Sequence, residues 1–331
     1  MATELNRRSF VRKSVLASAG AALAMRENGQ RELAAAEPKV TGAVTTTPLP
    51  QGIIGDLRIS RLLLGGNLLT HYTHSRDLKY VYSLAKSYNT DQKILDTLAL
   101  AEENGVNTVV VHNVPATIKL LQKHRNRGGK MQWITCTFHA LTRSPQQFHR
   151  ELEQLVDAGT DALYVSGVEA DTLCGFKNDI SASDSGQRKS PPQLEKLAEA
   201  VEIAKAHGLP TGLGAHRIGT IEDCERVGID VDFYLKTIHH HNSPTAHIEY
   251  DSNFCPDPDR VKSVMQQVNK PWIAFKVMAA GAIPAENAFE FALNAGADFV
   301  LAGMFDFEIA EDARLIREIV PRVKRDRPVL T

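Results

Sequence analysis

Short apolar runs alternate with longer amphipathic stretches along residues 57–331 of the 331-residue chain. The eight runs are "RLLLGGN" (61–67), "TVVVHN" (108–113), "QWITCTF" (132–138), "ALYVSG" (162–167), "PTGLGAH" (210–216), "FYLKTIH" (233–239), "WIAFKVMAAG" (272–281) and "FVLAGMF" (299–305). The stretches between them, such as "SPQQFHRELEQLVDAG" (144–159), repeat apolar residues at helical spacing, open with Ser or Pro and stop at Gly. Eight β–α units with nearly continuous apolar strands predict an α/β fold, a single-domain (β/α)8 or TIM barrel. The main alternative, an open doubly wound sheet, usually has fewer strands, and no G-x-G-x-x-G follows the first strand here.

The first 36 residues have a different composition. Arg7 and Arg8 precede a weakly apolar run at 15–24, and small-residue cleavage patterns follow at 22–24 and 34–36. This arrangement resembles a twin-arginine export signal. We therefore expect a signal peptide at 1–36, a Pro-, Thr- and Gly-rich linker at 37–56 and the barrel at 57–331. Export by the twin-arginine machinery predicts a periplasmic or otherwise exported protein.

Composition excludes several classes of protein. Lys+Arg 38 against Asp+Glu 39 argues against a nucleic-acid-binding protein. After the N-terminus no apolar run approaches the roughly 20 residues that span a bilayer, so we expect no stable membrane insertion after signal cleavage. The four cysteines lack C-x-x-C spacing, which argues against a thiolate metal cluster and leaves disulfide pairing open. They are Cys136, Cys174, Cys224 and Cys255.

Three connections that follow predicted strands are unusually long, at 68–90, 168–189 and 242–255. Loops after the strands of a barrel form its active-site face, so the extra length predicts a lid or a substrate wall. The same face collects the polar residues that end the strands. They are Asn67, His112, Asn113, His139, Ser166, His216, Lys236, His239, His240, His241, Lys276 and Asp306. We expect Asn67, His112, Asn113, His139 and Ser166 to bind a small-molecule substrate.

Glycines follow the last two strands, at Gly281 and Gly303. Phosphate-binding barrels use these loops, although the glycines could equally serve tight turns, and the carboxylates of Asp306 and Glu308 would repel a phosphate. We keep both glycines as candidate substrate-binding positions.

Two lysines lie on neighbouring predicted strands. Period-two alternation places Trp272, Ala274, Lys276 and Met278 on one face, which we expect to point into the barrel, and it places Lys236 inward together with Tyr234. A lysine desolvated beside another cation has a pKa of roughly 7–8 and can attack a carbonyl to form a Schiff base. Salt bridges with Asp232, Asp161 or Asp306 are the structural alternative for these lysines.

"DFYLKT" (232–237), "WIAFKVMAAGAI" (272–283) and "AGADFVLAGMF" (295–305) resemble the second half of class I aldolases of the deoxyribose-phosphate type. The resemblance implies Lys236 as the Schiff-base lysine, Lys276 as the residue that lowers its pKa, and Asp161 as a proton shuttle. It covers about the last third of the chain. It departs after the KT pair, where Ile238 and three histidines replace the family's glycine.

The histidines allow a second mechanism. His216 and His239 end adjacent predicted strands, and Glu169, Asp171 or Asp306 could add a carboxylate ligand for a divalent ion such as zinc or manganese. Such an ion would polarise a carbonyl in a sugar lyase or isomerase. No fixed spacing supports the site, and ordinary hydrogen-bonded roles for these histidines stay open.

"RISRLLLGGN" (58–67) and "ELEQLVDAGTDALYV" (151–165) resemble aldo-keto reductases, but their catalytic residues do not carry over. His112-Asn113 stands where the family has Asp, "WITCTF" (133–138) lacks its lysine, and Ser166 replaces its histidine. The whole chain also resembles an exported, barrel-type family of bacterial proteins.

These observations favour a periplasmic lyase, aldolase-like and without a cofactor, or an isomerase, acting on a small carbonyl or sugar-like compound. Lys236 and Lys276 would act on the carbonyl, and His216 and His239 would act as acid and base. A metal-dependent sugar lyase or isomerase, a barrel related to aldo-keto reductases and a non-catalytic binding barrel are the alternatives.

Overall fold

The computed structural model describes residues 48–137, 144–176, 188–244, 255–325 and 327–328. The chain divides into two units, Met1–Thr41 and Gly42–Thr331, and every described residue belongs to the second. The predicted signal peptide and His139 lie outside the described residues. In the described part of the chain, no helix has the length and apolar character needed to cross a bilayer.

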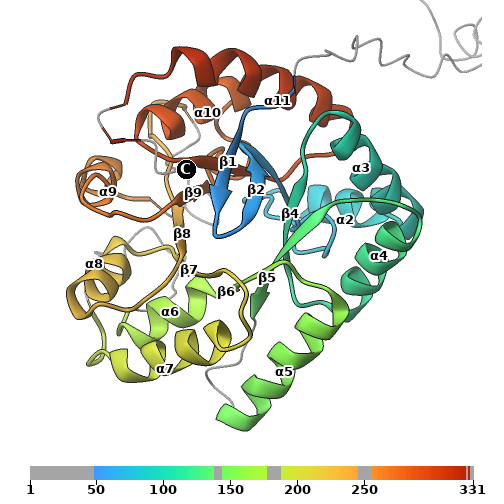
Figure 1. Ribbon diagram of the computed structural model, residues 1–331. Helices are drawn as coiled ribbons and strands as arrows, with labels where there is room; N and C mark the ends of the chain where they lie inside the picture. The colour runs from blue at the N-terminus through green and yellow to red at the C-terminus, as the bar shows by residue number, and fades with distance from the viewer. Residues whose placement is uncertain (1–47, 138–143, 177–187, 245–254, 326, 329–331) are drawn as a thin grey trace, which may run out of the picture. The chain divides into compact units, whose positions relative to one another are not determined.

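A closed barrel of parallel strands forms the centre of the second unit (Figure 1), so the predicted TIM barrel is confirmed. Its strands, in spatial order from the first, are β3 (Leu62–Gly65), β4 (Thr108–His112), β5 (Gln132–Thr137), β6 (Ala162–Val165), β7 (Thr211–Ala215), β8 (Phe233–Thr237), β9 (Trp272–Phe275) and β10 (Phe299–Ala302). β10 pairs with β3 and closes the ring. Each strand falls within one of the eight predicted runs.

Helices surround this barrel. They are α2 (Lys79–Tyr88), α3 (Asp91–Glu103), α4 (Pro115–Asn126), α5 (Pro145–Ala158), α6 (Gly167–Leu173), α7 (Leu194–Lys205), α8 (Ile218–Val227), α9 (Pro258–Met265), α10 (Ala285–Asn294) and α11 (Asp306–Ile319), followed by the 3-10 turn η1 (Val320–Arg322). The predicted punctuation is visible in α5: Ser144 and Gln147 form a capping box, and Gly159 ends the helix at φ 97°.

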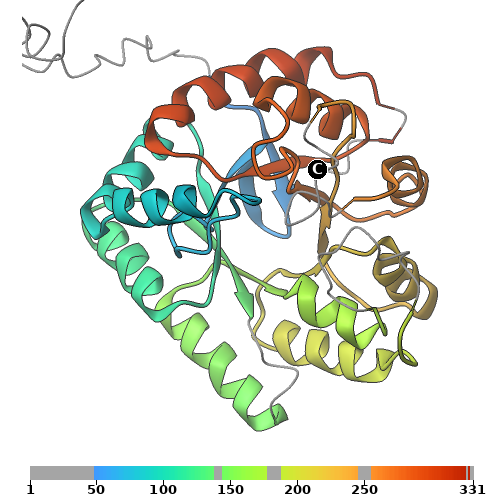
Figure 2. The same ribbon diagram turned by 180° about the vertical axis from the view of Figure 1, so that it is seen from behind.

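A hairpin covers the amino-terminal end of the barrel. β1 (Gln51–Ile54) pairs antiparallel with β2 (Leu57–Ser60), although residues 51–54 fall within the predicted linker. Ile54 and Ile59 are fully buried and pack with the side chains of the barrel interior. Figure 1 looks onto this hairpin, and Figure 2 looks from the opposite side, where α2 lies nearest the viewer.

The predicted facing of β8 and β9 is wrong. Phe233, Leu235 and Ile273 pack inside the barrel with the hairpin, whereas Tyr234 and Trp272 pack outward among the helices. The hydroxyl of Tyr234, for example, donates to Glu225 of α8 at 2.6 Å. Both faces of a covered parallel strand are apolar, so the pattern of apolar residues does not show which face points inward.

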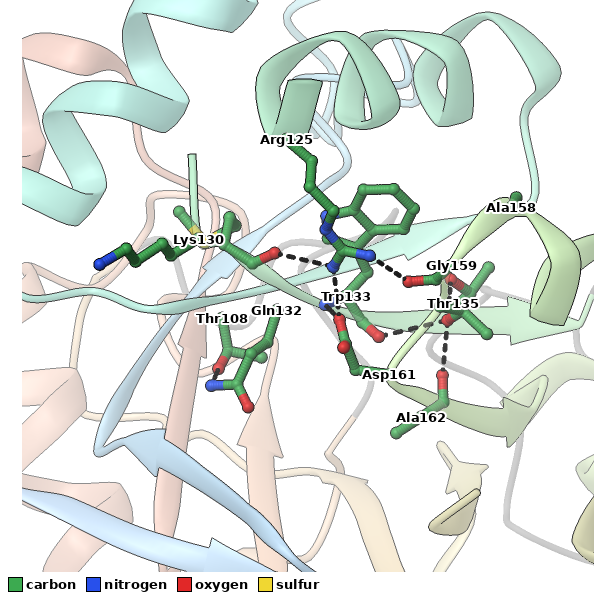
Figure 3. A network of polar contacts seen from close by, with 12 residues as sticks. Thr108, Arg125, Lys130, Gln132, Trp133, Thr135, Ala158, Gly159, Asp161 and Ala162 are labelled. Atoms are coloured by element: carbon green, nitrogen blue, oxygen red, sulfur yellow. Dashed lines mark hydrogen bonds and ion pairs between the residues drawn. The ribbon is translucent and has the colours of Figure 1, made fainter. Parts of the chain in front are cut away.

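A polar network fastens the amino-terminal ends of β5 and β6 (Figure 3). Asp161, just before β6, pairs with Arg125 at 2.9 Å and accepts the backbone N–H of Trp133 at 2.8 Å. The Arg125 guanidinium also stacks 3.9 Å from the centre of the Trp133 ring and donates to the carbonyl of Gly159. This network lies at the end of the barrel away from the strand carboxyl ends, and it stabilises the fold.

Candidate functional site

A cavity of about 650 Å³ opens at the carboxyl ends of the strands. This volume is typical of small-molecule sites. Among the described residues, every barrel strand except β8 contributes to its lining, either directly or through the residues that follow the strand. The predicted site residues that line it are Asn67, His112, Ser166, His216, Lys276, Gly281 and Gly303.

The long connection after β3 forms one wall of this cavity, as its length predicted. Tyr72, His74, Leu78 and Val81 all line it, and α2 begins within this connection. The Tyr72 ring meets the ring of His112 edge to face, with centroids 5.5 Å apart. The other two long connections contribute only Val168 among their described residues.

His216, just after β7, is held by a buried carboxylate. Its Nδ1 lies 3.1 Å from Oδ2 of Asp171, which is fully buried in α6. The same carboxylate accepts the backbone N–H groups of His216 and Arg217 and the hydroxyl of Thr220. Because an ionised carboxylate only accepts hydrogen bonds, this partner assigns the proton to Nδ1 and leaves the lone pair on Nε2.

The electrostatics keep His216 neutral near pH 7. Burial lowers the pKa of His216 below its ordinary value of 6.5, and the charges of Lys276 and Lys236 lower it further, against the opposing effect of Asp171. A neutral, oriented imidazole on the wall of a cavity can act as a general base. His112, which lines the same cavity, has its pKa lowered to about 4, chiefly by burial, so it is also neutral.

Lys276 enters the cavity because the backbone departs from strand geometry. β9 ends at Phe275, and Lys276 has a left-handed φ of 58°, followed by Ala279, Ala280 and Gly281, which also have positive φ. Such a conformation is strained for a residue other than glycine and is concentrated at functional sites. Regular alternation would have turned Lys276 to the outer face with Ala274. Instead its Nζ lies 3.1 Å from Nε2 of His74.

Lys236 occupies a different environment. It is fully buried within β8, on the outward face, and its Nζ donates to the carbonyls of His216 and Thr237 at 2.9 and 2.7 Å. The pKa of Lys236 is lowered to about 8, as a Schiff-base lysine would require, but the main cause is burial and Lys276 is not among the causes. Lys236 is not among the described residues that line the cavity, so the geometry does not support its attack on a substrate carbonyl bound there.

The other predicted residues are also placed away from the cavity lining. His239 is buried, with its Nε2 accepting the backbone N–H of Cys255. Asn113 donates to Glu151 at 2.8 Å, and Asp161 belongs to the network at the opposite end of the barrel. Glu169 is buried in α6. Asp306 pairs with Lys93 at 2.8 Å at the start of α11.

The arrangement of these residues does not support the metal-dependent alternative. Among the described residues, no group of three or more His, Cys, Asp or Glu side chains is placed to hold a metal ion. His216 lines the cavity and His239 does not.

Sequence reasoning missed two contributors to the site. Asp171 appeared only as a possible metal ligand, because its contact with His216 joins residues 45 positions apart. His74 was overlooked, although its place in the long connection after the first strand was a usable signal. Both residues act by contact with a residue that had been predicted.

No protein-family model and no curated protein matches the chain. Among solved structures, it is similar to an aldo/keto reductase from Brucella melitensis, with 11% identity, 82% of this chain and 98% of that chain covered, and a TM-score of 0.49. It is also similar to Gox0644 in its apo form (9% identity, 85% and 96% covered, TM-score 0.50) and to a variant of Gox0644 in complex with NADPH (10%, 85% and 96%, 0.50). The aldolase resemblance gains no support from these structures. At these identities the likeness to Gox0644 shows the fold, a (β/α)8 barrel.

Proposed function

We propose that this chain is a barrel enzyme that shares its fold with aldo-keto reductases, binds a small carbonyl compound and catalyses proton transfer at the carbon next to the carbonyl group. The observation that carries the proposal is the pairing of His216 with buried Asp171 on the wall of a cavity that Lys276 also lines. The proposal needs no cofactor.

His216 is the base in this proposal. Nε2 takes the proton from the carbon next to the carbonyl, and Asp171 stabilises the imidazolium that results. The same base can return the proton to a neighbouring carbon, which is isomerisation. Alternatively, it can take the proton of a hydroxyl group on the second carbon from the carbonyl, so that the bond between the first and second carbons breaks to give an aldehyde and an enolate, which is a lyase reaction. Both reactions pass through an enolate, in which the former carbonyl oxygen of the substrate carries a negative charge.

Lys276 provides the positive charge for that oxygen. Its ammonium group lies in a cavity whose lining is mainly apolar, where an electrostatic interaction is stronger than in water. Lys276 and His216 both line this cavity, so one small molecule bound there can contact both groups. The charge of Lys276 also lowers the pKa of His216. Attack of Lys276 on the carbonyl to form a Schiff base is the covalent version of this role.

Nicotinamide-dependent reduction is the second candidate, because a variant of Gox0644 binds NADPH on a similar fold. The residues present here do not fit that cofactor well. The first turn of α11, after the last strand, holds the carboxylates of Asp306 and Glu308, and Glu308 accepts the backbone N–H of Phe305 at 2.8 Å. Asp306 is paired with Lys93, but the carboxylate of Glu308 lines the cavity and takes a backbone N–H at that helix end, which disfavours a nucleotide phosphate there. The proposed reaction therefore does not use NADPH.

The test is deuterium exchange. Short hydroxyketones, ketoses and 2-oxo acids would be incubated with the full chain in D2O and followed by NMR, with a parallel series containing NADPH whose absorbance is monitored. The proposal predicts enzyme-dependent loss of the proton next to the carbonyl without NADPH. Exchange that is absent while NADPH is consumed would favour reduction. Saturable binding with neither result would indicate a non-catalytic binding barrel.

The place of action in the cell is a separate proposal. Arg7 and Arg8 before a weakly apolar run support export by the twin-arginine machinery, which would place the barrel in the periplasm. Replacing both arginines by lysine should retain the protein in the cytoplasm, and fractionation of cells would measure it.

A further inference from the structure

Two of the four cysteines lie in the same buried cluster, on segments that other residues join. Cys174 follows α6, Cys224 lies within α8, and both side chains are fully buried. The Cys174 side chain, together with burial, raises the pKa of Cys224 well above its ordinary value. Cys136 and Cys255 differ from this pair: the thiol of Cys136 donates to the carbonyl of Thr137, and the pKa of Cys255 is affected by Lys236 and not by another cysteine.

A side-chain contact joins α6 to α8 about one turn before each cysteine. The hydroxyl of Thr220 donates to Oδ1 of Asp171 at 2.7 Å. Asp171 stands one turn before Cys174, and Thr220 stands one turn before Cys224. Residues three or four apart share a helix face, so the face that carries Asp171 and Cys174 meets the face that carries Thr220 and Cys224.

Arg188 also holds the same two segments together. Its Nη1 donates to the carbonyl of Cys174 at 2.7 Å and pairs with Oδ2 of Asp223 at 2.6 Å. Asp223 directly precedes Cys224 and is buried. These contacts therefore hold the segment of Cys174 next to the segment of Cys224.

We propose that Cys174 and Cys224 form an intramolecular disulfide when the chain meets a disulfide-bearing oxidant. One thiolate attacks the oxidant to give a mixed disulfide, and the second thiolate displaces the oxidant's other half. The two cysteines lose two protons and two electrons, and the oxidant's disulfide is reduced to two thiols. The sulfur–sulfur bond formed here replaces the one broken in the oxidant.

The proposed bond has a consequence that rests on the proposed function. It would close a loop of about 50 residues and tie α6 to α8, and such crosslinks stabilise mainly by restricting the unfolded chain. α6 carries Asp171, so the bond would also hold the carboxylate that orients His216. Because both thiols are buried, oxidation should be slow in the folded protein and fast while the chain refolds.

The test uses the reduced full chain with oxidised glutathione, both folded and during refolding from urea. Remaining thiols would be alkylated, and peptides would be mapped by mass spectrometry without reductant. We expect two thiols to disappear, a peptide pair linking Cys174 to Cys224, and a Tm rise on the order of 5–10 °C that reductant reverses. Cys255→Ala should still lose two thiols, whereas Cys174→Ala and Cys224→Ala should not form the linked pair.

Four alkylated cysteines after oxidative refolding would overturn the proposal, as would a linked pair that involves Cys136 or Cys255, or glutathione retained on Cys174. The mapping of the parent chain decides the matter even if a cysteine variant fails to fold. It does not use enzymatic activity, so failure of the proposed function would leave this result intact.

Discussion

The ends of β8 and β9 present two lysines in opposite ways. Lys236 lies inside a regular strand, follows the alternation of side chains and points outward. There its amine donates hydrogen bonds to two backbone carbonyls. Lys276 lies one residue beyond its strand, takes a left-handed conformation and enters the cavity. The sequence around β8 contains more titratable groups, yet the residues of the proposed reaction, His216 and Lys276, follow β7 and β9. A break in regular strand geometry, more than the number of ionisable residues, therefore distinguishes the lysine that lines the cavity.

The largest effect should follow from removing the base on the cavity side. His216→Asn keeps a side chain that can bond Asp171 but has no basic nitrogen, so proton exchange should fall about 1000-fold, within the range for general base catalysis. The rate of deuterium incorporation by NMR measures this. His207→Asn is the matched control, since His207 does not line the cavity and should keep the parent rate. An exchange rate within threefold of the parent for His216→Asn, in a folded protein, would remove His216 from the mechanism.

On the β8 side, the expected effect is on stability and its dependence on pH. Burial lowers the pKa of His239 to about 4 from its ordinary 6.5, so the unfolded chain binds the proton first as pH falls. The stabilisation is complete above pH 6.5 and is lost as pH falls toward 4, a difference of about 3 kcal/mol. Urea unfolding would measure the free energy of unfolding at pH 7.5 and at pH 4. The difference between the two values should be smaller in His239→Asn than in the parent, by about 3 kcal/mol.

The same variant sharpens the comparison between the two regions. At pH 7.5 His239→Asn should keep its exchange activity, because His239 does not line the cavity. If His239→Asn loses exchange activity and keeps the parent's pH dependence of unfolding, His239 has a catalytic role and not the stabilising role assigned to it here. His240→Asn, which removes a less buried neighbour, should change the pH dependence less.

A smaller effect is expected from Asp171→Asn, since Asp171 acts through His216. Exchange should fall roughly 10- to 100-fold as the orientation and the stabilisation of the imidazolium are weakened. Asp171 raises the pKa of His216, so its removal lowers that pKa and moves the acid limb of the rate profile to lower pH. The measurement is the exchange rate against pH. A lower rate with an unmoved acid limb would point to a purely structural role for Asp171.

The fold could be predicted from sequence because it depends on local patterns that repeat. Eight apolar runs, the Ser144 cap and the Gly159 stop each report on a short segment, and together they define the barrel. Facing could not be predicted, because both faces of β8 are apolar apart from Lys236 and pack against different layers. Strand-end position correctly singled out His216 and Lys276 as cavity residues.

Two features of the site were out of reach of sequence patterns. Lys276 has a left-handed backbone conformation, which is usually predicted only where the residue is glycine. The sequence therefore does not predict the turn that brings this lysine into the cavity. The contact of Asp171 with His216 depends on α6 packing against β7. Gly167 and Gly214 allow that packing, since an added Cβ on Gly214 would lie only 2.8 Å from the Gly167 nitrogen. Such contacts follow from the folded topology.

The most direct test of the account compares Lys276→Met with Lys236→Met in the deuterium-exchange assay, with rates expressed per folded molecule from urea unfolding. The account predicts that Lys276→Met loses exchange at least 100-fold with little change in stability, because its charge serves the oxygen of the substrate. It predicts that Lys236→Met keeps exchange within about threefold but loses about 2–4 kcal/mol of stability, since two buried carbonyls lose their donor. The reverse result, with exchange abolished by Lys236→Met and retained by Lys276→Met, would contradict it and return the chemistry to the end of β8.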